Sequence, residues 1–134
     1  MRRQPLPSKP LFRVLYVEHN DDSREMLRLL LALSRIDVTA VASAESALSL
    51  IQEHRFDLYL LDSWLPDTSG FELCRQMREI HPKTPVLFFS GEAFEADKQR
   101  GIEAGATAYV CKPDLPKLLG SISRFLPQAA SAAA

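Results

Sequence analysis

The feature of this sequence that most constrains its fold is a regular alternation of short apolar segments with longer amphipathic ones. The short segments are rich in β-branched and aromatic residues, which predicts strands at residues 11–17, 38–41, 56–61, 86–89 and 107–111. A segment with the apolar spacing of a helix follows each of them. Strands that alternate with helices in this way predict successive βα units and a parallel sheet.

Four of the predicted helices carry apolar residues at the spacing of one helix face. These stripes are Met26, Leu29, Leu30 and Leu33; Ala44, Ala47, Leu48 and Ile51; Leu73, Cys74, Met77 and Ile80; and Leu115, Leu118, Leu119 and Ile122. The other helix, at about residues 94–104, has a thin apolar face with Gly101 inside it. Residues 21–23, Ser43 and Asp114 stand where helix caps and first-turn acids belong.

Two of the predicted strands are apolar along their length, at residues 58–61 and 86–89. Such strands are buried on both faces, so helices are expected to cover both sides of the sheet. Right-handed crossovers then give an α/β fold with a doubly wound, five-stranded parallel sheet and five helices. Ligands of these sheets bind beyond the carboxyl ends of the strands, and functional residues are expected there.

Length and composition fit one globular domain with one hydrophobic core, predicted at residues 11–126 of the 134. An extended lead-in at residues 1–10 and a low-complexity tail at residues 127–134 flank it. The formal net charge of −1 gives no reason to expect binding to nucleic acid or to an anionic membrane. No apolar run reaches the roughly 18–20 residues of a membrane span. Cys74 and Cys111 have no CxxC partner, which favours free thiols in the reducing cytoplasm.

Polar side chains stand at the carboxyl ends of four predicted strands. Glu18 and His19 follow the first strand, Asp62 the third, Ser90 the fourth and Lys112 the fifth. If the first and third strands are neighbours, these groups converge on one pocket. Its chemistry suits phosphoryl transfer onto a carboxylate, with Asp62 as the nucleophile. Lys112 and a divalent cation would neutralise the phosphoryl oxygens, and Ser90 would donate a hydrogen bond to them.

Four stretches of the sequence, VLYVEHN, DLYLLDSWLPDTSG, VLFFSGEA and AGATAYVCKP, occur in this order. At these residues the chain resembles the receiver domain of two-component response regulators, as in chemotaxis regulators, over about residues 11–126. The resemblance implies the flavodoxin-like strand order 2-1-3-4-5. It also implies that Asp62 is the phosphoacceptor, Ser90 the switch hydroxyl and Tyr109 the switch aromatic residue. Lys112 would bind the phosphoryl group from a cis peptide bond to Pro113.

The same resemblance implies a Mg²⁺ site. Glu18, Asp62 and the backbone carbonyl of Trp64 would be its ligands, and His19 occupies the second position of the acidic pair. The family usually has aspartate there. A neutral imidazole is a poorer ligand than a carboxylate for Mg²⁺, so weaker metal binding is expected.

As a receiver, the chain would take its phosphoryl group from a histidine kinase or a histidine phosphotransfer protein that docks mainly against the first helix. No second domain follows in this sequence, so output is expected through a downstream protein bound at the fourth helix, fifth strand and fifth helix. Neither nucleic acid nor a membrane is an expected partner. Such a chain would catalyse its own phosphorylation and dephosphorylation without being a metabolic enzyme.

Three other functions are compatible with parts of the sequence. A degenerate receiver that binds partners without phosphate is suggested by His19. A dehalogenase-type phosphatase requires a DxD motif after its first strand, whereas Asp62 follows the third. A flavin or dinucleotide protein requires a Gly-rich or Ser/Thr-rich first loop, whereas the loop here, EHNDDS, is acidic.

Overall fold

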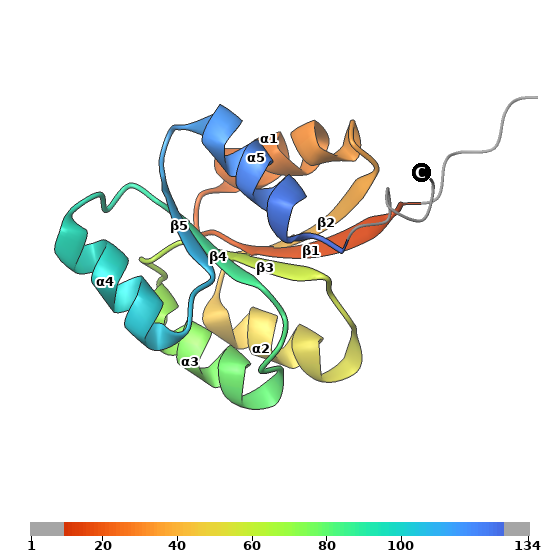
Figure 1. Ribbon diagram of the computed structural model, residues 1–134. Helices are drawn as coiled ribbons and strands as arrows, with labels where there is room; N and C mark the ends of the chain where they lie inside the picture. The colour runs from red at the N-terminus through yellow and green to blue at the C-terminus, as the bar shows by residue number, and fades with distance from the viewer. Residues whose placement is uncertain (1–9, 128–134) are drawn as a thin grey trace, which may run out of the picture.

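The computed structural model describes residues 10–127 and shows five strands that alternate with five helices (Figure 1). Most of the predicted lead-in and tail, residues 1–9 and 128–134, lies outside the described residues. The elements are β1 (Phe12–Val17), α1 (Asp21–Ala32), β2 (Ile36–Val41), α2 (Ala44–Glu53), β3 (Leu58–Leu61), α3 (Gly70–Ile80), β4 (Val86–Ser90), α4 (Glu95–Ala104), β5 (Ala108–Cys111) and α5 (Leu115–Phe125). None of the helices in this described range is long and apolar enough to cross a membrane.

The strands form one parallel sheet in the order β2-β1-β3-β4-β5. This confirms the doubly wound, flavodoxin-like order expected from the resemblance. Helices α1 and α5 cover one face of the sheet, and α2, α3 and α4 cover the other (Figure 1). The order places β1 directly beside the central strand β3, which is the condition for the predicted site to assemble.

Each face of the sheet carries its own layer of core, because successive side chains of a strand point to opposite faces. Leu15, Val17 and Leu61 pack in the layer of α2, α3 and α4. Val14 and Leu60 pack in the layer of α1 and α5. The four residues of β3 and the five of β4 are all buried, as their apolar sequence predicts.

The buried face of α1 differs from the predicted one. Met26, Leu29 and Leu33 are 48%, 55% and 83% exposed, whereas Leu27 and Leu31 are buried. The helix contains two overlapping leucine stripes, and periodicity alone gives no means of choosing between them. Its N-cap is Asn20, one residue before the segment 21–23 that was predicted to hold the cap and the first-turn acids.

Helix α4 has a thin apolar face because it packs its backbone closely against β5. Its buried residues are Gly101 and Ala104, and a Cβ atom on Gly101 would lie 3.0 Å from Cδ2 of Tyr109. Phe94 and Ile102 of the same segment are 79% and 59% exposed. Gly101, which weakens the helical pattern in the sequence, is therefore what allows this helix to approach the sheet.

Candidate functional site

The site lies at the carboxyl ends of β1, β3 and β5. The parallel pairing of Val17 with Leu61 places Glu18 and Asp62 at the ends of two neighbouring strands. The backbone N–H of Asp62 donates to the carbonyl of Val17 at 3.0 Å, which continues the ladder into the loop. The backbone N–H of Lys112 donates to the Ser90 carbonyl at 2.8 Å, so the end of β5 is fixed to the end of β4.

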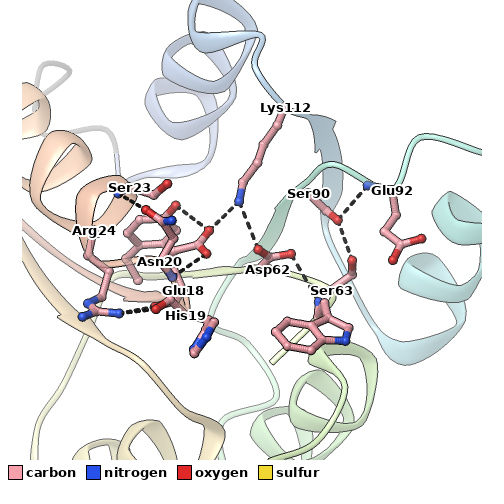
Figure 2. A network of polar contacts seen from close by, with 12 residues as sticks. Glu18, His19, Asn20, Ser23, Arg24, Asp62, Ser63, Ser90, Glu92 and Lys112 are labelled. Atoms are coloured by element: carbon pink, nitrogen blue, oxygen red, sulfur yellow. Dashed lines mark hydrogen bonds and ion pairs between the residues drawn. The ribbon is translucent and has the colours of Figure 1, made fainter. Parts of the chain in front are cut away.

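Lys112 joins the two carboxylates (Figure 2). Its Nζ atom lies 2.5 Å from Oε1 of Glu18 and 3.0 Å from Oδ2 of Asp62. The peptide bond from Lys112 to Pro113 is cis, as the resemblance implied. Burial by itself lowers the pKa of Lys112, but its two carboxylate partners raise that pKa above the ordinary value. The ammonium group therefore stays charged between two strands whose ends it connects.

Glu18 is almost completely buried, at 3% exposure, and both of its oxygens are bonded. The Tyr16 hydroxyl donates to Oε1 at 3.2 Å, and the backbone N–H of Asn20 donates to Oε2 at 3.0 Å. Burial raises the pKa of Glu18, but the hydrogen bonds from Lys112 and Asn20 bring that pKa below its ordinary value. Glu18 is thus a fixed anion at the floor of the site.

Asp62 has the opposite balance. Burial raises the pKa of its carboxyl group, and the negative charge of Glu18 raises it further, so that the pull of Lys112 does not compensate. Its Oδ1 atom accepts a hydrogen bond from the backbone N–H of Trp64 at 3.2 Å. Of the two carboxylates, Asp62 is the one whose charge the protein stabilises less.

The loop after β3 is held at both of its ends. The Asp67 carboxylate accepts hydrogen bonds from the backbone N–H groups of Ala44 and Glu45, at 3.1 and 2.9 Å, and so caps α2 from outside. A Cβ atom on Gly70 would lie 1.9 Å from the backbone oxygen of Asp62. Only glycine lets α3 begin so close to Asp62, a constraint that the sequence showed only as loop punctuation.

Ser90 and Tyr109 lie on the other side of Asp62 from Glu18. The Tyr109 hydroxyl donates to the Glu92 carbonyl at 2.6 Å, and its ring stacks on Phe88 with centroids 5.5 Å apart. The Ser90 hydroxyl contacts the hydroxyl of Ser63, a residue that sequence analysis did not single out. The only signal in the sequence was a polar residue at the carboxyl end of an apolar strand.

His19 is exposed, and its ring meets the Trp64 indole edge to face at a centroid distance of 5.6 Å. Trp64 is itself 60% exposed. The two rings form a small aromatic pair at the rim of the site. Asp21, another acid near the end of β1, is paired with Arg24. Arg24 also donates to the backbone carbonyls of Glu18 and His19, which fixes this loop.

The donor set fits a hard cation in part. The oxygens of Glu18 and Asp62 are ligands of the kind that Mg²⁺ prefers. Within residues 10–127, however, no group of three or more Asp, Glu, His or Cys side chains is arranged to hold a metal ion. The position that would supply a third carboxylate holds His19 instead, whose ring faces Trp64.

Comparison with known proteins places the chain in a family. The model of the response regulator receiver domain matches residues 14–123. The cell cycle response regulator CtrA of Brucella ovis is 37% identical over 101 residues, which are 75% of this chain and 44% of that protein. The transcriptional regulatory protein ResD of Bacillus subtilis is 32% identical over 105 residues, 78% of this chain and 43% of that protein. The chain thus spans less than half the length of these relatives.

Solved structures show the same architecture. The chemotaxis response regulator CheY4 of Vibrio cholerae superposes with a TM-score of 0.80 at 30% identity, over 89% of this chain and 100% of that one. The non-phosphorylated receiver domain of HemR from Leptospira biflexa gives a TM-score of 0.79 at 31% identity, over 87% of this chain and 94% of that one.

Proposed function

The chain belongs to the family of response regulator receiver domains, and from this premise we propose that it is a switch that accepts a phosphoryl group on Asp62. Receiver domains are signalling modules of two-component systems and not metabolic enzymes. The observation that carries the proposal is the contact of Lys112 with both Asp62 and Glu18. This ammonium group lies at the ends of β1, β3 and β5. It is close enough to Asp62 to bind the oxygens of a phosphoryl group that is transferred there.

In the proposed reaction a carboxylate oxygen of Asp62 attacks the phosphorus of a phosphohistidine on the donor protein. The new O–P bond forms as the P–N bond breaks, and the donor imidazole takes up a proton from solvent and leaves as the neutral base. The ammonium group of Lys112 moves from the Asp62 carboxylate to the phosphoryl oxygens, and Ser90 donates a hydrogen bond to them. Mg²⁺, when bound, supplies further positive charge to these oxygens. Glu18, Asp62 and the Trp64 carbonyl would hold it.

An apolar hollow beside the site suits the docking of the phosphodonor. Met26, Leu29, Leu30, Leu33 and Leu115 line a cavity of about 530 Å³ between α1 and α5. A neighbouring cavity of about 220 Å³ shares Met26 and Leu115 and extends to Lys112. Met26, Leu29 and Leu33, three of the four residues of the α1 stripe that was expected in the core, therefore lie exposed, and Met26 also lines the cavity that reaches Lys112. We propose that a helical histidine kinase or phosphotransfer protein packs on it.

The first experiment measures phosphoryl uptake by Asp62 from ³²P-labelled acetyl phosphate, with and without Mg²⁺. Wild type should be labelled in the presence of Mg²⁺, and Asp62→Asn should lose the label. Asp22→Asn removes an exposed acid at the start of α1 and should be labelled like wild type. Equal labelling of wild type and Asp62→Asn would contradict the assignment of the phosphoacceptor.

A second experiment tests the docking surface. Leu29→Glu places a charge on the exposed α1 stripe and should slow transfer from a phosphorylated histidine donor by about tenfold or more, since burying an unpaired charge is unfavourable. Labelling by acetyl phosphate should not change. Ile102→Glu adds the same charge on α4, on the opposite face of the sheet, and should leave both reactions intact (Figure 1).

A degenerate receiver is the second candidate function, and one observation favours it. His19 replaces the expected acid and faces Trp64, so that the metal site has only two carboxylates. A wild-type protein that takes up no phosphoryl group at saturating Mg²⁺ would decide for this alternative.

In either case the output we propose is a downstream protein partner in the cytoplasm, in keeping with two free cysteines and a net charge of −1.

A further inference from the structure

Two buried serine hydroxyls meet next to Asp62. Ser63 is 5% exposed and Ser90 is fully buried, and their Oγ atoms lie 2.5 Å apart. Ser90 Oγ also accepts the backbone N–H of Glu92 at 3.1 Å. The hydroxyl of Ser90 is therefore bonded toward Ser63 and Glu92, whereas the Asp62 carboxylate is bonded toward Lys112 and Trp64 (Figure 2).

The pairing of β3 with β4 explains why these two hydroxyls meet. Leu61 is opposite Phe88 in the parallel register, and the same register continued by two residues places Ser63 opposite Ser90. Residues two apart in a strand share a face, so both serines lie above the core layer that contains Leu61 and Phe88. The hydroxyl pair replaces what would otherwise be an apolar contact at the top of this layer.

We propose that Ser63 is a positioning residue that holds the Ser90 hydroxyl in its resting place, and that phosphorylation of Asp62 draws Ser90 away from it. The inference rests on the proposed function of Asp62. A hydroxyl has one proton to donate, and Ser90 must aim that proton at a phosphoryl oxygen to sense the new group. Leaving Ser63 breaks a hydrogen bond between two buried hydroxyls, which is unfavourable. The Ser63–Ser90 hydrogen bond therefore stabilises the unphosphorylated arrangement. It raises the free energy needed for Ser90 to move to the phosphoryl group.

The same bond reaches the output side of the domain. Glu92 donates its N–H to Ser90, and its carbonyl accepts the Tyr109 hydroxyl at 2.6 Å. Tyr109 in turn lies against Gly101 of α4. A movement of Ser90 away from Ser63 also changes the hydrogen bond at Glu92, and with it the anchor of Tyr109. Ser63 thus restrains the first step of a path that leads to α4.

The test is a double-mutant cycle on the affinity for beryllofluoride, a phosphoryl mimic, at saturating Mg²⁺ by ¹⁹F NMR. Ser63→Ala should bind beryllofluoride about tenfold more tightly than wild type, because the competing bond is gone. In the Ser90→Ala background the same change should have no effect, because Ser63 acts through Ser90. Unchanged or weaker binding by Ser63→Ala, or an equal gain in both backgrounds, would overturn the proposal.

Ser63→Cys is the second variant, since it keeps nearly the size of serine but bonds more weakly, and its affinity should fall between those of wild type and Ser63→Ala. Ser49→Ala, at an exposed position of α2, is the control and should bind like wild type. A wild type that neither binds beryllofluoride nor accepts a phosphoryl group would overturn the proposed function, and this inference with it. Normal binding by wild type together with an unaltered Ser63→Ala affinity would overturn the inference alone.

Discussion

At the scale of single residues, the two carboxylates that share Lys112 have pKa values shifted in opposite directions. Hydrogen bonds hold the pKa of Glu18 below its ordinary value in spite of burial. Burial, together with the charge of Glu18, raises the pKa of Asp62. A shifted pKa in the folded state is also a pH-dependent contribution to stability, and the two residues contribute with opposite sign.

Asp62→Asn should therefore stabilise the metal-free protein at pH 7. The ionised form of Asp62 is disfavoured by folding, so it destabilises the wild type at pH values above its raised folded pKa. This advantage of the variant should shrink as pH falls through that folded pKa, and vanish below the unfolded value of about 3.9. Urea unfolding in EDTA between pH 7 and pH 3 measures it.

Glu18→Gln is the matched comparison and should behave in the opposite way. Its carboxylate is favoured by folding, so the stability it contributes is full above the unfolded pKa of about 4.3 and is lost as pH falls through the lowered folded pKa. The variant should be less stable than wild type at pH 7 and approach it in acid. Two variants that shift stability in the same direction would contradict the assigned pKa directions.

His19→Asp should tighten Mg²⁺ binding by about tenfold. Two unit charges about 4 Å apart interact by about 4 kcal/mol at an effective dielectric constant of about 20, and desolvation cancels much of this. A remainder near 1.4 kcal/mol corresponds to the tenfold change. Titration of the Trp64 fluorescence with MgCl₂ measures the affinity. His54→Asp, which adds the same charge at the exposed end of α2, should leave it unchanged.

At the scale of the elements, α3 begins directly against the backbone of Asp62, because Gly70 has no side chain. Gly70→Ala would place a Cβ atom against the backbone of Asp62, which cannot rotate away. We expect a loss of stability of about 1–3 kcal/mol, as for other overpacked sites. Chemical unfolding measures the loss.

Gly120→Ala tests the same change in open space. Gly120 lies inside α5, and nothing is within 4 Å of an added Cβ atom there. Alanine should stabilise the helix by about 0.5–1 kcal/mol, because glycine loses more backbone entropy on folding. A destabilised Gly120→Ala, or a neutral Gly70→Ala, would show that steric approach is not what distinguishes the two positions.

At the scale of the whole molecule, the site and α4 are connected through Tyr109. Tyr109→Phe keeps the ring stacked on Phe88 but loses the hydrogen bond to the Glu92 carbonyl. We expect a stability loss of about 0.5–1.5 kcal/mol and unchanged phosphoryl uptake. The change in hydrogen exchange that beryllofluoride induces in α4 should become smaller. Tyr59→Phe removes a hydroxyl bonded to Thr84, away from the site, and should leave the response of α4 intact.

The sequence by itself determined the order of the elements and the positions from which the site is built. Apolar strands alternate with amphipathic helices, and a parallel sheet brings the carboxyl ends of its strands to one edge. Residues that directly follow those strands, such as Glu18, Asp62 and Lys112, are therefore predictable as neighbours. Their proximity can be predicted from the order of residues in the chain, because each of them directly follows its own strand.

Only the tertiary structure decided which faces and side chains meet. The leucine stripes of α1 are equivalent until the sheet selects one of them: Leu27 and Leu31 are buried, and the opposite stripe, on which we propose that the phosphodonor docks, is left largely exposed. The Ser63–Ser90 bond and the contact of Gly70 with Asp62 depend on distances between separate segments. The contact between the rings of His19 and Trp64 also depends on such a distance. Such contacts are properties of packing, which local periodicity does not encode, because they exist only once the two core layers have formed.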